Sequence, residues 1–199
     1  RLFTADAAHD LRTPLAGIRL HLELMAQSGS PQANALISRI DQLMHTVEQL
    51  LMLARAGQAL ASGHYETVNW TDSIIVPLSL EHEAKEHTVI WPDKSPLTVQ
   101  GDTVLLRLML RNLLENATRY SPTGTTIEVK LMEHDGGTQV IVVDQGPGID
   151  EAHRQSITEP FRRLDQRYGG SGLGLSIVQR IVQLHHGKLT LENGVEGGL

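Results

Sequence analysis

The chain has 199 residues, a formal net charge of −6 at neutral pH and no cysteine. The negative charge argues against nucleic acid or an anionic membrane as the main partner, and the absence of cysteine excludes disulfides, thiolate metal sites and thiol catalysis. No apolar run reaches the roughly 20 residues that cross a bilayer, so we expect no membrane contact within this chain.

Two helices with a heptad pattern are expected in residues 1–56. In the first, residues 1–26, apolar side chains recur at alternating spacings of four and three: Leu11, Leu15, Ile18, Leu22 and Met25. After a turn at 27–32, the second helix repeats the pattern with Leu36, Ile40, Leu43, Val47, Leu50 and Ala54. Because one helical hairpin cannot bury both faces of its seam, we expect two copies to pair as a four-helix bundle. A purely structural dimerisation unit would show the same pattern.

The start of the first helix carries polar side chains outside this seam. If Leu15 and Leu22 occupy a positions, His9 falls at b and Thr13 at f, one turn apart, and Asp10 falls beside them at c. These side chains are therefore expected to face solvent or a visiting partner. On position alone, ordinary surface residues would explain them equally well.

A Gly- and Ser-containing break at 57–64 is expected to be a linker to a second domain at 65–199. The pattern there predicts helices at 71–86 (interrupted by Pro77), 102–119 and 172–185, the last ending near Gly187. Short apolar or alternating segments predict strands at 65–70, 89–91, 97–100, 126–132, 139–143 and 188–192, with 139–143 central in the sheet. The expected fold is α+β: a helical hairpin, then a two-layer α/β sandwich with helices on one face of a mixed sheet.

The predicted helix at 102–119 carries a row of polar residues, Asn112, Asn116 and Arg119, at spacings of four and three. A surface-facing amide pair is the simple interpretation. The functional interpretation is a set of neutral oxygen ligands for a hard cation such as Mg²⁺, which shares its coordination shell with substrate phosphates.

Two glycine-containing turns follow. Asp144 ends an apolar strand and precedes Gly146 and Gly148. Such a segment is often only a turn, but a buried carboxylate there could accept hydrogen bonds from an exocyclic amine while the glycines admit a flat ring. Further along, a glycine cluster runs directly into a helix, which favours anion binding, although it matches neither the P-loop nor the Rossmann pattern. Its residues are Gly170, Gly172, Leu173 and Gly174.

Together these segments resemble a known family. The string from His9 to Leu15, His-Asp-Leu-Arg-Thr-Pro-Leu, resembles the phosphoacceptor box of two-component sensor histidine kinases. The asparagine pair, the Asp144 turn, the segment around Phe161 and the glycine cluster resemble, in order, the N, G1, F and G2 boxes of an ATPase module. Histidine kinases, gyrase-type topoisomerases and related chaperones share that module. The resemblance covers nearly the whole chain, and residues 3–17 look like the polymyxin-resistance branch of sensor kinases.

This resemblance implies roles for the residues at the start of the chain. His9 would take the γ-phosphoryl group of ATP, with Asp10 fixing the ring tautomer and accepting its proton. Thr13 matches the position that orients water when the partner's aspartate is dephosphorylated, although a plain surface threonine is a serious alternative.

It also implies a nucleotide site for ATP and Mg²⁺. Asn116 would coordinate the metal with support from Asn112, while Arg119 and Tyr120 would contact the nucleotide. Asp144 would bind the adenine amine, and Gly146 and Gly148 would make room for the ring. The glycine cluster would form the lid hinge and phosphate cradle, and a positive charge from Arg162, Arg163 or Arg167 would stabilise the transferring group, with the choice left open.

The expected partners are a second copy of the chain and the receiver domain of a response regulator, with no nucleic acid. The family also implies that the chain is the cytoplasmic portion of an inner-membrane sensor, and that its ATPase domain is truncated before a last strand. Two alternatives are an ATP-hydrolysing conformational ATPase of the gyrase or chaperone type, and a dimerisation scaffold that only binds nucleotide.

Overall fold

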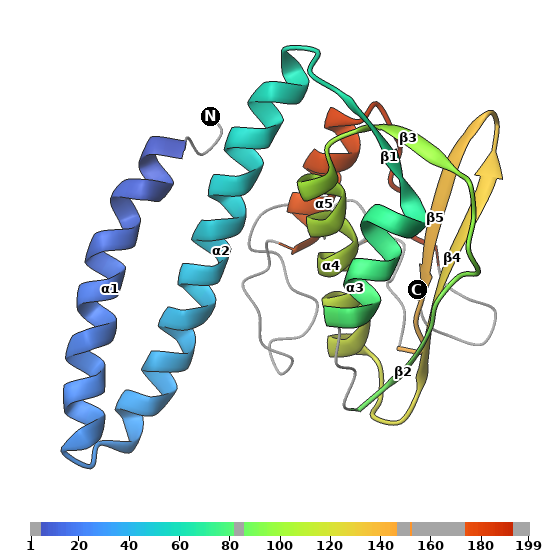
Figure 1. Cartoon of the computed structure of the whole chain (residues 1–199). Coiled ribbons are helices and arrows are strands. Elements are labelled where there is room, and N and C mark those ends of the chain that lie inside the picture. The colour runs from blue at the N-terminus through green and yellow to red at the C-terminus, as the bar shows by residue number, and fades with distance from the viewer. Residues whose placement is uncertain (1–4, 82–85, 147–151, 153–173, 193–199) are drawn as a thin grey trace. The chain divides into compact units, whose positions relative to one another are not determined.

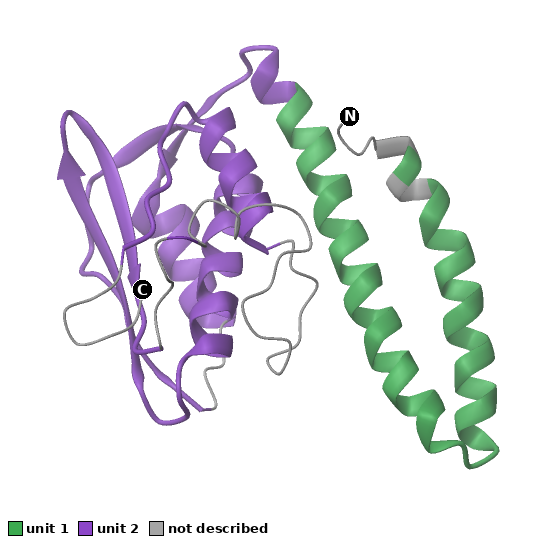
Figure 2. Ribbon diagram, turned by 180° about the vertical axis from the view of Figure 1, so that it is seen from behind, with its two compact units in different colours: residues 1–58 green, residues 59–199 purple. Residues whose placement is uncertain are grey.

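The chain divides into two compact units, residues 1–58 and 59–199, coloured separately in Figure 2. The computed structural model describes residues 5–81, 86–146, 152 and 174–192. Its elements, labelled in Figure 1, are α1 (Ala5–Gln27), α2 (Pro31–Ala61), β1 (Glu66–Asn69), the π-helix η1 (Trp70–Ile75), α3 (Val76–Glu81), β2 (Thr88–Ile90), β3 (Thr98–Gly101), α4 (Thr103–Tyr120), β4 (Thr126–His134), β5 (Gly137–Val143) and α5 (Gly174–Leu184).

The first unit is the predicted hairpin of two antiparallel helices, α1 and α2 (Figure 1). The turn between them contains Gly29 at φ +88°, a conformation that glycine adopts without a Cβ clash. Pro14 lies inside α1, where it removes one backbone donor without ending the helix. Neither these helices nor any other in the described part of the chain is long and apolar enough to cross a membrane.

The two halves of the heptad seam differ in burial. The a-position side chains Leu15 and Leu22 are buried, and Leu15 packs with Val47 and Leu51 of α2. The d-position side chains of α1 and their counterparts on α2 are instead 40–48% exposed: Leu11, Ile18, Met25, Leu36 and Leu43. The hairpin therefore uses half of its apolar pattern internally and leaves a heptad-spaced stripe exposed.

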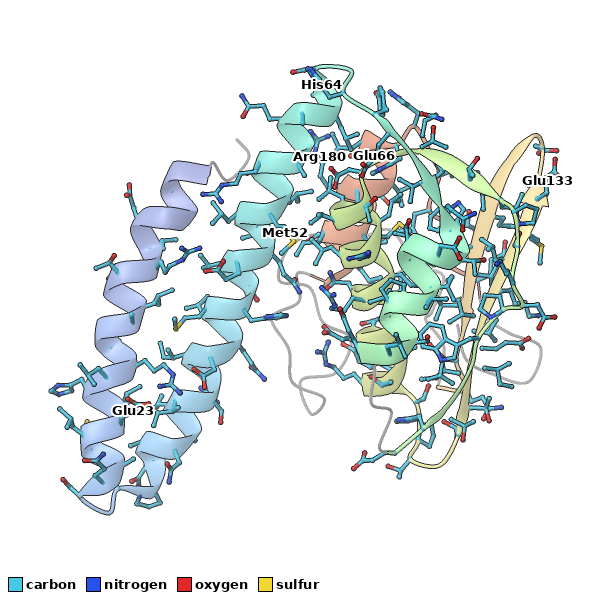
Figure 3. The ribbon with its side chains drawn as sticks, viewed as in Figure 1. Glu23, Met52, His64, Glu66, Glu133 and Arg180 are labelled. Carbon is cyan, nitrogen blue, oxygen red and sulfur yellow. The ribbon has the colours of Figure 1, made fainter. Side chains whose placement is uncertain are left out.

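Two ion pairs join α1 to α2 one heptad apart. Arg12 binds Glu48 at 2.6 Å, and Arg19 binds Asp41 at 2.5 Å. Arg19 also contacts Glu23, which is labelled in Figure 3. Hydrogen bonds to Asp41 and then Glu23 raise the pKa of the Arg19 guanidinium. From the first pair to the second, the residue number rises by seven on α1 and falls by seven on α2. The two pairs therefore fix a single antiparallel register.

The helix α2 continues to Ala61, so residues 57–61 of the predicted linker are helical. The cause is local, since alanine and glutamine favour helix in this stretch and Leu60 is buried at 1% exposure. The chain leaves the helix at a turn in which Gly63 has φ +82°. The composition break therefore marks the end of α2 rather than a wholly non-helical connection.

The second unit is the predicted two-layer α/β sandwich. In its three-stranded sheet, β4 lies between β2, to which it is parallel, and β5, to which it is antiparallel. The strands β1 and β3 form a separate antiparallel pair. The helices α3, α4 and α5 lie on one side of β4 and β5 (Figure 1), and Ile127 and Val129 of β4 are buried. The sheet is therefore mixed, with its helices on one face.

Two strand predictions are wrong for the described residues. The segment 139–143 was expected at the centre of the sheet, but β4 holds that place and residues 140–143 are only half-buried. Residues 188–192 form no strand. A strand exists only where a neighbour accepts its backbone hydrogen bonds, and no described segment pairs with these residues.

Pro77 does not break the predicted helix in two. The π-helix η1 runs directly into α3, with Pro77 as the second residue of α3. The proline has no N–H to offer the carbonyl of Ser73, four residues earlier. That carbonyl accepts a hydrogen bond from Arg107 Nε of α4 at 2.6 Å. Arg107 thus donates the hydrogen bond that the proline cannot.

Two carboxylates cap the start of α4. Asp102 Oδ1 accepts a hydrogen bond from the backbone N–H of Leu105 at 2.9 Å. Glu66 Oε1, from β1, accepts bonds from the backbone N–H of Thr103 at 3.0 Å and from its hydroxyl at 2.7 Å. These bonds stabilise the charged carboxylate and lower the pKa of Glu66, which is labelled in Figure 3. The first turn of α4 is thereby tied to β1.

Candidate functional site

The predicted phosphoacceptor residues lie near the start of α1. His9 belongs to this helix, while its side chain lies outside the described part of the structure. Asp10 and Thr13 are both exposed. Arg12, between them, is held by Glu48 of α2. This ion pair orients the helical turn and leaves its polar face accessible to a partner.

Asn112 is a buried residue of α4, with 5% exposure, so it is not part of a surface amide pair. Its Nδ2 donates to the carbonyl of Leu108 at 2.9 Å. A Cβ added to Gly174 would lie 3.5 Å from Asn112 Oδ1, which places the first residue of α5 beside this oxygen. Asn116, one turn further along α4, is half-buried. The middle of α4 thus presents amide groups next to the start of α5.

Asp144 directly follows β5 and is buried. Its Oδ1 accepts a hydrogen bond from the backbone N–H of Gly146 at 2.9 Å. A Cβ added to Gly146 would lie 2.5 Å from the carbonyl oxygen of Tyr120, the last residue of α4. Between them, Gln145 donates its backbone N–H to Ser121 Oγ at 3.3 Å. The end of β5 is therefore fastened to the end of α4.

Ser121 was not singled out from the sequence, although it is buried and holds two segments to the end of α4. Besides the bond to Gln145, its carbonyl accepts a hydrogen bond from His87 Nε2 at 3.1 Å. The only available signal was its position two residues after Arg119, where the predicted helix ends. Its partners are distant in the sequence and carry no recognisable spacing.

The helix α4 is the element around which the described residues of the predicted nucleotide site gather. Asn112 and Asn116 lie in its second half, Arg119 and Tyr120 are half-buried at its end, and Gly174 lies against it. The remaining residues predicted for the nucleotide site lie outside the described part of the chain: Gly148, Arg162, Arg163, Arg167, Gly170, Gly172 and Leu173.

Three kinds of polar group are thus gathered around α4. Amide oxygens of the Asn112 and Asn116 type are ligands that Mg²⁺ accepts alongside phosphate oxygens. The described part of α5 begins at Gly174, directly after the glycine cluster of the sequence, and a helix N-terminus favours an anion. Asp144 supplies a buried carboxylate acceptor. A magnesium nucleotide presents a cation, phosphates and an exocyclic amine, so these groups fit it.

Comparison with known protein families agrees with the predicted phosphoacceptor segment and with the predicted nucleotide site. Residues 1–59 match the model of the His Kinase A (phospho-acceptor) domain, and residues 101–199 match that of the histidine kinase-, DNA gyrase B- and HSP90-like ATPase. The chain belongs to the sensor histidine kinase family. A match to the phosphoacceptor domain disfavours a gyrase- or chaperone-type ATPase, and a match to the ATPase domain disfavours a structural dimerisation unit.

Individual sensor histidine kinases are similar over nearly the whole chain. The sensor protein BasS of Escherichia coli strain K12 is 52% identical over 201 residues, covering 98% of this chain and 55% of BasS. The sensor protein kinase PmrB of Pseudomonas aeruginosa strain PAO1 is 35% identical over 206 residues, covering 99% of this chain and 43% of PmrB. These relatives agree with the predicted polymyxin-resistance branch. The chain spans about half the length of these curated relatives.

A solved structure supports the same architecture. The crystal structure of full-length ShkA in complex with AMPPNP superposes with a TM-score of 0.72 at 26% identity, covering 98% of this chain and 43% of ShkA. That histidine kinase core therefore shares the hairpin and the α/β ATPase domain seen here.

Proposed function

We propose that this sensor histidine kinase phosphorylates its own His9 from Mg-ATP and passes the phosphoryl group to an aspartate of a response regulator receiver domain. The observation that carries the proposal is the convergence on α4: Asn112 Oδ1 lies beside the first residue of α5, and the buried Asp144 is fastened to the other end of the same helix.

The adenine end of the nucleotide is assigned to the loop after β5. Asp144 uses Oδ1 to hold the backbone of Gly146 and, as a carboxylate, retains acceptor capacity for the adenine amine. Gly146 and Gly148 leave room for the ring, and Arg119 and Tyr120 contact the nucleotide from the end of α4. Burial of Asp144 strengthens this recognition because water competes poorly there.

The phosphate end is assigned to the region between α4 and α5. Asn116 coordinates Mg²⁺ and Asn112 supports it, since both present neutral oxygens on one side of α4. Mg²⁺ supplies charge neutralisation for the phosphates when bound. The phosphates are cradled by Gly170, Gly172, Leu173 and Gly174 at the start of α5, and Arg162, Arg163 or Arg167 stabilises the charge of the group in transfer.

Phosphoryl transfer then uses the residues of α1. A ring nitrogen of His9 attacks the γ-phosphorus, the bond to the bridging oxygen breaks, and ADP leaves with the electron pair. The proton on the other ring nitrogen is stabilised by Asp10, which keeps the attacking nitrogen unprotonated. In a separate phosphatase activity, Thr13 orients a water molecule that hydrolyses the aspartyl phosphate of the response regulator.

The exposed d-position stripe supports a homodimer. Side chains such as Ile18 and Leu43, each more than 40% exposed and heptad-spaced with their neighbours, are covered when two hairpins pair as a four-helix bundle. We assign residues 1–56 to dimerisation and phosphotransfer, 57–64 to the connection and 65–199 to ATP binding. The chain is the cytoplasmic portion of an inner-membrane sensor.

Incubation with γ-labelled ATP and Mg²⁺ tests the class of activity. Retention of label by the wild-type chain, and its loss in Asn116→Ala, supports the kinase. Release of labelled phosphate without labelled protein would favour a hydrolysing ATPase. Nucleotide binding with neither label nor release would favour a scaffold.

A further inference from the structure

The ring of His185 joins two helices at the end of the ATPase domain away from Asn112. His185 follows α5, and its Nε2 accepts a hydrogen bond from the backbone N–H of Asp102, the N-cap residue of α4, at 3.1 Å. Its Nδ1 lies 2.7 Å from the carbonyl oxygen of Ile181. Since a carbonyl only accepts, Nδ1 carries the proton, and Nε2 is then the acceptor that Asp102 requires. Both bonds select the same neutral tautomer.

A glycine makes this ring position possible. A Cβ added to Gly101, the last residue of β3, would lie 2.3 Å from His185 Cδ2 and 2.5 Å from Nε2. Gly101 is buried, and its φ is not in the left-handed region, so the absence of a side chain serves the close approach of the ring. His185 therefore provides the acceptor for the Asp102 N–H, and Gly101 leaves the space that the ring occupies.

The two ends of α5 are thus attached to α4 in different ways. At the start of α5, Gly174 lies beside Asn112 Oδ1. Along the helix, the contact is a stripe of buried aliphatic side chains: Leu175, Ile177, Val178 and Ile181. Aliphatic packing is not directional, so it sets the rotation of α5 more strongly than its position along α4. The hydrogen bond from the Asp102 N–H to His185 Nε2 is directional and joins the end of α5 to the start of α4, so it fixes that position. The bond to Ile181 lies within α5 and orients the ring.

We propose that His185 is a positioning residue for nucleotide phosphates: by fixing α5 against the start of α4, it holds the first turn of α5 beside Asn112. This inference rests on the proposed function, since it assigns the phosphates to that turn. The effect acts along the length of α5, about 16 Å at 1.5 Å per residue, and involves no contact between His185 and nucleotide.

Variants of the full 199-residue chain separate this role from general folding. His185→Leu removes both hydrogen bonds, whereas His185→Gln retains an acceptor for Asp102. Gly101→Ala displaces the ring without changing it. The controls are His186→Asn, which loses an exposed contact with Tyr65 and suits the left-handed φ of +57° at this position, and Gly137→Ala, where an added Cβ has its nearest neighbour at 3.7 Å.

The readouts are the Kd of Mg-AMPPNP by calorimetry, the Kd of adenosine by chemical-shift titration, and the thermal midpoint of each variant. We expect His185→Leu and Gly101→Ala to weaken AMPPNP binding by about tenfold with adenosine binding unchanged, His185→Gln to recover part of the loss, and both controls to bind like wild type. A merely structural role would weaken AMPPNP and adenosine equally.

Equal losses for both ligands, or unchanged AMPPNP binding in folded His185 variants, would overturn the inference. If His185→Leu does not fold, His185→Gln and Gly101→Ala decide the outcome by the same comparison. A wild-type chain that fails to bind Mg-AMPPNP would overturn the proposed function, and with it this inference, so the two failures are distinguishable.

Discussion

Gly146 lies so close to Tyr120 that a Cβ on the glycine would be 2.5 Å from the tyrosine carbonyl oxygen. The same glycine donates its N–H to Asp144 Oδ1. This contact sets the distance between the loop after β5 and the end of α4, and through it the placement of the buried carboxylate.

Gly146→Ala should therefore destabilise the ATPase domain. The methyl group meets backbone rather than a flexible side chain, so the loop must move, at a cost of about 1–3 kcal/mol in the free energy of unfolding. Urea denaturation measures this cost, with Gly137→Ala as the control, since a Cβ there would meet only the carbonyl oxygen of His134 at an ordinary 3.7 Å. A Gly146→Ala protein as stable as wild type would show that the contact is not needed.

Asp144→Asn should separate recognition from folding. The amide keeps an oxygen that can accept the Gly146 N–H, so we expect the free energy of unfolding to change by less than about 1 kcal/mol. Loss of the charged acceptor should weaken nucleotide binding by about tenfold or more, because hydrogen bonds to charged groups are the stronger ones. Calorimetric titration with Mg-AMPPNP measures the effect, and an unchanged Kd would remove Asp144 from the adenine site.

Ile18→Glu should prevent formation of the proposed dimer and leave a monomer. Ile18 is a d-position residue with 48% exposure, so the substitution costs the isolated hairpin little and places a charge in the proposed bundle interface. Leu20→Glu on the same helix is the matched control, since Leu20 is 59% exposed and lies at the f position, away from the seam. Sedimentation velocity would report the masses. Dimerisation that survives Ile18→Glu, or fails in Leu20→Glu, contradicts the assigned interface.

The Glu66 cap makes a pH-dependent contribution to stability. Its pKa is lowered in the folded state by the bonds from Thr103, so the charged form stabilises the fold above the ordinary pKa of 4.5 and this contribution is lost as the pH falls through the folded-state pKa. Relative to Glu66→Gln, wild type should be more stable at pH 7, by less than about 1 kcal/mol because the carboxylate is exposed. Denaturation at several pH values should show this difference shrinking as the pH falls below 4.5; a difference that grows on acidification would have the wrong sign.

The sequence predicted most helices because their signals are local. The heptads of α1 and α2 and the polar row of α4 depend on residues a turn apart, and each of these helices was found. That the helix continues through Pro77 was not predictable in this way. The carbonyl of Ser73, which the proline leaves without a donor, accepts a hydrogen bond from Arg107 of α4, 30 positions after the proline.

In the site, too, local motifs were predictable and contacts between distant residues were not. The order of the motifs identified Asn112 and Asp144, and a buried carboxylate was one interpretation of Asp144. The burial of Asn112 was not predicted, since it depends on how α5 packs on α4. Gly101 and His185 gave no functional signal at all. Their relationship joins residues 84 positions apart and becomes visible only when β3, α4 and α5 are assembled.

The most direct test asks whether His9 holds the phosphoryl group. Wild type and His9→Gln are incubated with γ-labelled ATP and Mg²⁺, and the labelled protein is then exposed to acid or alkali. We expect wild type to carry a label that acid removes and alkali does not, as for a phosphoramidate, and His9→Gln to carry none. Label on His9→Gln, or an acid-stable label on wild type, would contradict phosphorylation of His9.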